Sequence, residues 1–120
     1  MMKLRCAILF AKDLPALVAF YRDGFGLRVV TDTPTWMELD AGGATLGIHA
    51  IPRDIADAIV VTSPPARRAE TPIKLVFEAA DLDAAIADLS RRGAVMDAPN
   101  AWGGCDGIDP EENVFQIARH

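Results

Sequence analysis

Two stretches of the chain, CAILFAKDLPALVAFYRDGFGL at residues 6–27 and KLVFEAADLDAAIADLSRRGAV at residues 74–95, follow one pattern. Each copy opens with an apolar run that ends at an Asp-Leu pair, Asp13-Leu14 in the first and Asp81-Leu82 in the second. A stretch with helical periodicity comes next, and glycines follow it, at Gly24 and Gly26 in the first copy and at Gly93 in the second. An internal repeat of this kind predicts that the two halves share one fold and identifies their equivalent positions.

The first half is expected to fold as β-α-β-β-β. A strand over residues 4–11 precedes a helix that Asp13 caps and that runs to about residue 23, with Pro15 harmless in its first turn. Strands over 27–31, 36–40 and 45–51 follow, and a turn at Ala41-Gly42-Gly43 joins the last two as a hairpin.

The second half repeats this order after a segment that has no counterpart. Residues 52–71 contain a proline-rich, loop-like core and one short helical piece near 55–59. A strand over 74–80, a helix over 83–92 and strands over 95–98, about 101–108 and 114–119 are then expected. We predict a single α+β domain of two tandem βαβββ modules, 1–51 and 74–120, with a linker at 52–73. The modules would form a curved mixed sheet, a cup, with the helices outside.

Strand alternation divides each sheet into a helix-facing side and an open side. Small and apolar residues of the first and last strands are expected to pack on the helices. The residues between them would face the inside of the cup, where a ligand would bind. Together with the two tryptophans that precede third strands, these give the candidate binding residues Cys6, Phe10, Trp36, Glu38, His49, Lys74, Glu78, Trp102 and Gln116.

Further local motifs accompany the repeat. They are Phe20-Tyr21-Arg22-Asp23-Gly24-Phe25-Gly26-Leu27, Phe77 to Leu82, Leu89 to Gly93, Trp102-Gly103 and Asp109-Pro110-Glu111-Glu112-Asn113-Val114-Phe115. In this order and spacing they resemble the glyoxalase / bleomycin-resistance / extradiol-dioxygenase superfamily, also called vicinal oxygen chelate proteins. The resemblance covers nearly the whole chain outside the linker.

The last of these motifs departs from the family in one residue. Family members usually carry Asp-Pro-Asp-Gly-Asn at this turn, whereas Glu112 takes the place of the glycine here. If this position needs a positive φ, the turn is expected to be mildly strained, because only glycine adopts that conformation at no steric cost.

The resemblance also implies where a metal would be held. Family enzymes place one ligand, usually His, in the first strand of each module and another, usually Glu, in the last strand. These places hold Cys6, Gly47, Lys74 and Gln116. Lysine offers no lone pair and repels a divalent cation, glycine has no side chain, and one thiolate does not suit catalytic iron, manganese or nickel. We therefore expect neither a metal nor another cofactor.

Two of the candidate groups have alternative interpretations. A substitute metal site would need Cys6, Glu38, His49 and Glu78 to converge. No pair of them has a diagnostic ligand spacing, so we favour His49 as a lining residue and Glu78 as the ion partner of Lys74, with which it shares a strand face.

Lysine and the aromatic residues could also act on a ligand. Lys74 either anchors an anionic or carbonyl-bearing ligand or is neutralised at the rim of the cup. Phe10, Trp36 and Trp102 either form stacking walls for a flat or apolar ligand or pack in a core or interface.

Composition and charge exclude several classes of partner. The formal net charge is −5, with acidic and basic residues scattered, so there is no basic face for a nucleic acid. No apolar run approaches the roughly 18–20 residues that cross a bilayer, and the N-terminal residues show no signal-peptide pattern. The two cysteines are too few for a disulfide framework and are expected to be free thiols. We therefore expect a cytoplasmic protein without a membrane partner.

The resemblance implies a homodimer with binding clefts at or near the subunit interface. We expect a metal-free protein that binds a small molecule, such as an antibiotic or a hydrophobic metabolite. The alternative is an enzyme of the same superfamily, a lyase, isomerase or dioxygenase, with a rearranged metal site or with Glu38, Glu78 or His49 as a general base. A regulatory or partner-binding module is a third interpretation, and whether the chain is an enzyme stays open at this point.

Overall fold

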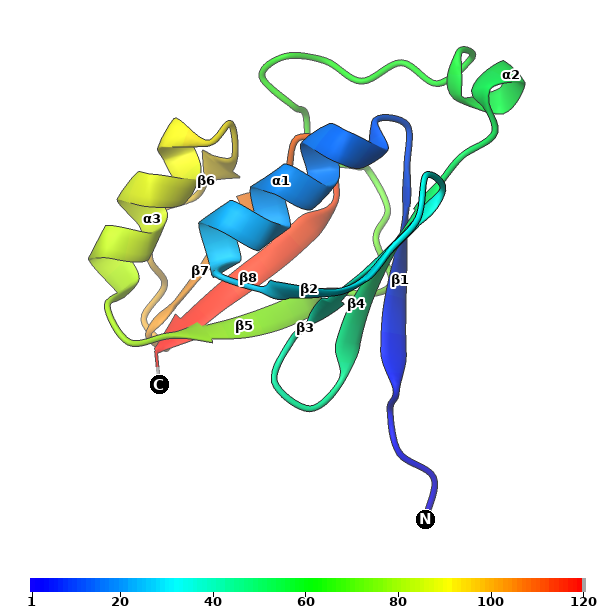
Figure 1. Cartoon of the computed structure of the whole chain (residues 1–120). Helices are drawn as coiled ribbons and strands as arrows, with labels where there is room; N and C mark the ends of the chain where they lie inside the picture. The colour runs from blue at the N-terminus through cyan, green and yellow to red at the C-terminus, as the bar shows by residue number, and fades with distance from the viewer. Residues whose placement is uncertain (120) are drawn as a thin grey trace. The chain divides into compact units, whose positions relative to one another are not determined.

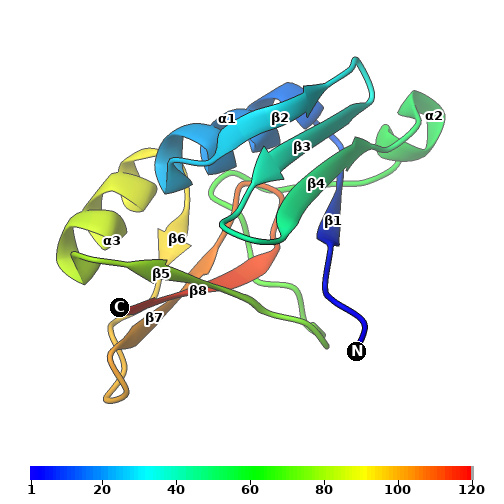
Figure 2. The same cartoon turned by 60° about the horizontal axis from the view of Figure 1, so that its bottom comes forward.

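The first half of the chain forms one four-stranded mixed sheet with a helix on one face. A computed structural model describes residues 1–119, and its backbone divides into two compact units, 1–60 and 61–120. In the first unit the strand order is β1-β4-β3-β2, with β1 parallel to β4 and the other neighbours antiparallel. Figure 2 shows β2, β3 and β4 side by side with α1 behind them. The elements are β1 (Cys6–Ala11), α1 (Leu14–Phe25), β2 (Arg28–Asp32), β3 (Trp36–Asp40), β4 (Thr45–Ala50) and α2 (Arg53–Ala56).

Helix α1 begins as predicted and ends later than predicted. The Asp13 carboxylate accepts a hydrogen bond from the Ala16 N–H at 3.1 Å, which caps the first turn. Gly24 stays helical, and the chain leaves the helix only at Gly26, whose φ of 68° is left-handed. The two extra residues place the ring of Phe25 against that of Tyr21, with centroids 4.9 Å apart, so aromatic packing accompanies the longer helix.

The second half repeats the architecture, which confirms the predicted α+β fold of two tandem βαβββ modules. Its strand order is β5-β8-β7-β6, with β5 parallel to β8, and Figure 1 shows α3 of this unit in yellow-green. Counted over residues 1–119, the chain has two four-stranded sheets and three helices. The grouping of the two modules into a single domain stays a prediction. The elements of this unit are β5 (Leu75–Ala79), α3 (Leu82–Arg91), β6 (Val95–Met96), β7 (Gly104–Ile108) and β8 (Val114–Arg119).

Strands β6 and β7 are shorter than the predicted 95–98 and 101–108. The side-chain oxygen of Asn100 accepts hydrogen bonds from the backbone N–H of Trp102 at 2.9 Å and of Gly104 at 3.0 Å. This asparagine turn takes the donors that a strand would use for pairing. Strand β7 therefore starts only at Gly104.

The division of each sheet into two faces is confirmed. On the closing strand of the first unit, Leu46 and Ile48 are buried, whereas His49 is exposed. On β1, Phe10 keeps 62% of its surface exposed. In the second unit Phe115 and Ile117 are buried and Gln116 between them is only partly so. One face of each sheet thus packs on its helix, and the other carries the candidate residues.

In the turn after β7, Glu112 occupies the position where family members usually have glycine, and the backbone there has a positive φ. Glu112 has a φ of 73°, and non-glycine residues in this conformation are uncommon. Its carboxylate accepts hydrogen bonds from the backbone N–H of Ala66 at 2.9 Å and from the Thr62 hydroxyl at 3.3 Å. The residue that strains the turn therefore also ties the linker to it.

Candidate ligand-binding faces of the two sheets

On the open face of the first sheet, Glu38 holds Trp36. The indole Nε1 donates to Glu38 Oε1 at 3.3 Å, and the Thr45 hydroxyl donates to Glu38 Oε2 at 2.7 Å. Both carboxylate oxygens thus have a partner on this face, and one of the two contacts orients the indole.

The indole of Trp36 lies across Gly47 on the neighbouring strand. A Cβ atom added at Gly47 would come within 2.2 Å of Trp36 Cη2 and 2.9 Å of Cζ3, far closer than atoms can approach. The backbone of Gly47 does not have a positive φ, so this glycine is needed for space and not for its conformation. The place where the family carries a metal-ligating side chain is filled by a tryptophan ring.

His49 lies between two aromatic rings. Its imidazole centroid is 5.9 Å from that of Phe10, edge to face, and 6.0 Å from that of Trp36. The structure thus brings four of the predicted binding residues, Phe10, Trp36, Glu38 and His49, onto one face. Cys6 lies at the start of β1 and is partly buried, with its thiol pointing to the carbonyl of Ala7 at 3.5 Å.

On the second sheet, Lys74 forms an ion pair with a residue that sequence reasoning missed. Its Nζ lies 3.2 and 3.1 Å from the two carboxylate oxygens of Asp106 on β7, and the side chains are 39% and 26% exposed. Gln116 lies directly opposite Asp106 in the register of β7 and β8. These residues form a polar cluster on the open face of the second unit.

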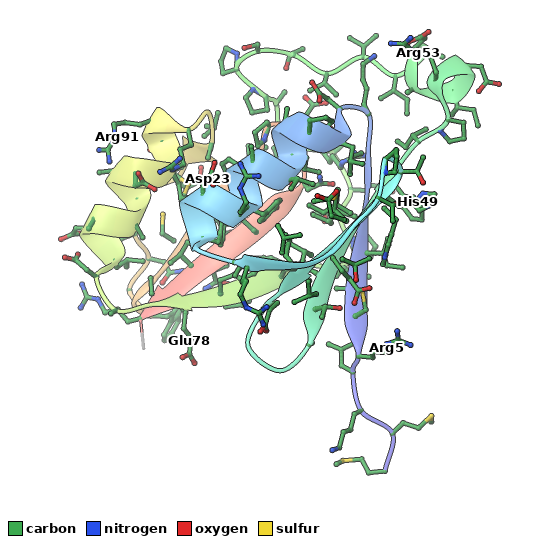
Figure 3. The ribbon with its side chains drawn as sticks, in the orientation of Figure 1. Arg5, Asp23, His49, Arg53, Glu78 and Arg91 are labelled. Carbon is green, nitrogen blue, oxygen red and sulfur yellow. The ribbon has the colours of Figure 1, made fainter. Side chains whose placement is uncertain are left out.

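The prediction that Glu78 neutralises Lys74 is wrong. Residues four apart on a strand are separated by roughly 13 Å, whereas a lysine side chain can extend sideways over the neighbouring strand to Asp106. Figure 3 shows Glu78 projecting away from β5. Laying Glu38 of the first half on the second half would have found Asp106, since both lie opposite the closing-strand ligand place.

The two modules fill equivalent space from opposite strands. In the first, Trp36 extends from β3 over Gly47 of β4. In the second, Gln116 extends from β8 over Gly104 of β7, where an added Cβ would come within 2.4 Å of the Gln116 Nε2. The bulky residue and the glycine have exchanged strands, which the repeat in the sequence does not reveal.

Trp102 is not a core residue. It lies in the turn before β7 with 91% of its surface exposed, and its backbone N–H binds Asn100. Its role in stacking on a ligand stays a prediction.

The residues at the expected metal-ligand places do not fit a catalytic metal. Lys74 presents an ammonium group that is already paired with Asp106, and the space beside Gly47 is filled by an indole. Across residues 1–119, no group of three or more His, Cys, Asp or Glu side chains is placed to share an ion. In the first unit, Cys6, Glu38 and His49 do not form such a group.

Both cysteines are free thiols, as the sequence predicted. Cys105 is fully buried, and its Sγ donates to the carbonyl of Asp97 at 2.9 Å. Burial, helped by the negative charges of Asp97 and Asp106, raises the pKa of the Cys105 thiol. This cysteine is a packing residue and not a reactive one.

A chain with two βαβββ modules, each with one helix-covered and one open sheet face, has the architecture that the sequence motifs predicted. Residues 3–117 match the family model of the Glyoxalase/Bleomycin resistance protein/Dioxygenase superfamily. The chain belongs to this superfamily. Among curated proteins, none matches it significantly.

Solved structures of the superfamily have the same fold. A glyoxalase/bleomycin resistance protein/dioxygenase family enzyme from Burkholderia phytofirmans PsJN is 20% identical, with a TM-score of 0.75 and 98% of each chain covered. A lactoylglutathione lyase from Agrobacterium tumefaciens is 23% identical, with a TM-score of 0.68, covering 98% of this chain and 92% of its own. An antibiotic-binding protein from Streptomyces sp. CB03234 is 22% identical, with a TM-score of 0.66, covering 99% and 96%.

Identities in this range show the fold and leave the activity open. None of the helices formed by residues 1–119 combines the length and the hydropathy that a bilayer span requires.

Proposed function

We propose that this chain is a small-molecule-binding member of the superfamily that works without a metal. The observation that carries the proposal is the content of the four inherited ligand places, Cys6, Gly47, Lys74 and Gln116. Gly47 is covered by the indole of Trp36, and Lys74 is paired with Asp106. Rebuilding a metal site would require new ligands in both modules.

In this proposal the open face of each unit is a binding surface by itself, and the two faces offer different contacts. The first sheet offers exposed apolar and aromatic surface, including Ile8 at 49% and Phe10 at 62% exposure, which would bury a hydrophobic ligand. The second offers the cluster of Lys74, Asp106 and Gln116, which would select polar substituents. A solved structure with the same fold is an antibiotic-binding protein from Streptomyces sp. CB03234, which supports a binding function for this chain.

Metal analysis tests the proposal directly. Protein purified without chelators should contain far less than one metal ion per chain, and Zn²⁺, Ni²⁺ or Mn²⁺ should not raise its melting temperature. A double variant, Lys74→His with Gln116→Glu, restores the usual His and Glu of the family to the second module and serves as the matched control. It should gain metal affinity, because two deprotonated ligands replace a cation and an amide. Stoichiometric, tightly held metal in the unaltered protein would overturn the proposal.

The rival function is catalysis in the same fold, by acid–base chemistry or with a rearranged metal site. The feature that favours it is the imidazole of His49, which makes ring contacts only, so its nitrogens can exchange protons with a ligand. Turnover of an α-keto thioacetal, an epoxide or a catechol that is lost in His49→Ala would establish catalysis. Ligand stabilisation without turnover supports binding alone.

We also propose that the protein is a homodimer, as the family resemblance implies, and that it resides in the cytoplasm. Sedimentation velocity at micromolar concentration should give the mass of two 12.9 kDa chains. A monomer over the whole concentration range would contradict the first of these proposals without affecting the binding function.

A further inference from the structure

Phe10, His49 and Trp36 form one row across three neighbouring strands of the first sheet. Phe10 on β1 is the register partner of His49 on β4, and His49 is the register partner of Trp36 on β3. The imidazole lies in the middle, with ring centroids 5.9 and 6.0 Å away on its two sides. The three side chains therefore share one face by strand register and not by chance proximity of loops.

The two flanking rings are inclined to the imidazole and are not stacked on it. The interplanar angles are 71° for Phe10 and 55° for Trp36. Phe10 keeps 62% of its surface exposed, so most of its ring is available to another molecule. A flat aromatic molecule gains both apolar burial and offset or edge contacts on such a surface.

Trp36 has a preset orientation in this row. Its Nε1–H is already bonded to Glu38, and its ring rests on the bare backbone of Gly47. The indole therefore offers a fixed apolar surface and no unused donor. Glu38 acts here as a positioning residue that fixes the tryptophan, and its other oxygen is held by Thr45.

The imidazole of His49 is the one polar group of the row that has no hydrogen-bond partner within residues 1–119. A neutral imidazole has one N–H donor and one acceptor nitrogen. Set between two aromatic rings, it can bind a hydroxyl or a carbonyl oxygen at the edge of a flat ligand. Ile8, 49% exposed, extends the apolar surface along β1.

We propose that this row recognises a planar aromatic ligand that carries a hydroxyl or ring-carbonyl oxygen, with the imidazole of His49 as its polar contact. The inference rests on the proposed binding function and specifies the ligand class for that site. It predicts selectivity for the oxygen substituent over an aromatic molecule of the same shape without it.

A matched pair of probes, 2-naphthol and 2-methylnaphthalene, tests this selectivity. Both would be titrated into the ¹⁵N-labelled full chain, with binding followed by amide chemical shifts of β1, β3 and β4. We expect both probes to shift amides around the row and 2-naphthol to bind about fivefold more tightly, the worth of one net hydrogen bond of about 1 kcal/mol. Binding of both probes with equal affinity, or no shift in these strands, would overturn the inference.

Three variants separate the roles of the rings. His49→Phe keeps an aromatic ring but removes the polar atoms, and should make the two affinities equal. Phe10→Ser should weaken both probes by about tenfold, the order of an aromatic contact worth 1.5 kcal/mol. Val60→Ser, at an apolar residue that is 81% exposed elsewhere in the same unit, is the control and should leave both affinities unchanged.

The outcomes also distinguish this inference from the proposed function. Compounds that bind the protein and shift amides only outside β1, β3 and β4 would refute the inference and preserve the binding function. Failure of every compound in a broad panel would refute the binding function itself. If the amides of the row shift on dilution and Phe10→Ser converts a dimer to a monomer, the row is an interface between two copies of the chain, and the inference is wrong.

Discussion

Replacing Gly47 by alanine adds one methyl group at the point where the first sheet is covered by Trp36. The added Cβ would lie 2.2, 2.9 and 3.0 Å from the Cη2, Cζ3 and Cζ2 atoms of the indole. These distances are well below van der Waals contact, so the indole ring of Trp36 must move. The backbone at residue 47 can accommodate alanine without strain, because Gly47 does not have a positive φ.

Opposing effects set the magnitude. Alanine in a strand is favoured over glycine by roughly 0.5–1 kcal/mol of backbone entropy. Against it, forcing a side chain out of a filled space costs roughly 1–3 kcal/mol, and loss of the hydrogen bond from Trp36 to Glu38 costs about 1 kcal/mol. We expect Gly47→Ala to lower the free energy of unfolding by about 1–3 kcal/mol.

A double-mutant cycle isolates the cause. In a Trp36→Ala background the indole is absent, so Gly47→Ala should be neutral or stabilising by up to about 1 kcal/mol. Urea denaturation measures the four free energies of unfolding. The chain has two tryptophans, so in a Trp102→Phe background Trp36 is the one that remains. The tryptophan fluorescence then reports the displacement of the Trp36 ring.

Gly104→Ala is the matched comparison in the second module. There the added Cβ would meet the Nε2 of Gln116 at 2.4 Å, at the end of a flexible side chain that can rotate away. Its cost should therefore be clearly smaller than that of Gly47→Ala. If Gly47→Ala destabilised the protein equally with and without Trp36, or left the emission of Trp36 unchanged, the role assigned to this glycine would be refuted.

Other predictions concern the turn at 109–113, between β7 and β8, and the cysteines. Asp109→Ala should lower the free energy of unfolding by about 3 kcal/mol in urea denaturation. The reason is that the buried carboxylate of Asp109 accepts hydrogen bonds from the backbone N–H of Glu111 at 2.8 Å and of Asn113 at 3.0 Å. A change below about 0.5 kcal/mol would contradict this reasoning. Glu112→Gly should change the free energy of unfolding by less than about 1 kcal/mol, since relief of the positive φ offsets the lost hydrogen bonds. The amide of Ala66 should exchange with deuterium faster in this variant, because it loses its hydrogen bond to the Glu112 carboxylate. Unchanged exchange of this amide would disprove that Glu112 holds the linker. Because burial raises the pKa of Cys105, the unfolded thiol ionises first as pH rises, so Cys105 should lower stability above about pH 8.5. Native Cys105 should also resist iodoacetamide while the partly exposed Cys6 reacts, and equal rates would show that the burial is wrong.

The element order was predictable because it depends on local patterns. Apolar alternation, the capping residue Asp13 and the recurring Asp-Leu pair identify strands and helices within a few residues of their observed ends. At the end of α1, two candidate residues competed. Gly24 and Gly26 could each end α1, and only the backbone of the folded chain shows that the left-handed conformation falls on Gly26.

The candidate site was less predictable, because its contacts cross strands. The positions of Phe10, Trp36, Glu38 and His49 on one face follow from alternation, and the structure agrees with it. The ion partner of Lys74 does not follow from alternation, because the lysine side chain extends sideways to Asp106 on another strand. Along a single strand, Glu78 is the nearest acidic residue on the face of Lys74, and only the pairing of neighbouring strands brings Asp106 within reach.

The sequence by itself determined that the chain consists of two equivalent βαβββ modules, and that the four inherited ligand places hold residues unsuited to a metal. These conclusions need only order, spacing and side-chain chemistry. Tertiary structure alone decided what occupies the space left at those places: an indole from β3 over Gly47 in one module, and an amide from β8 over Gly104 in the other. That choice depends on strand register and on which neighbour is large, and no local pattern in the chain encodes either.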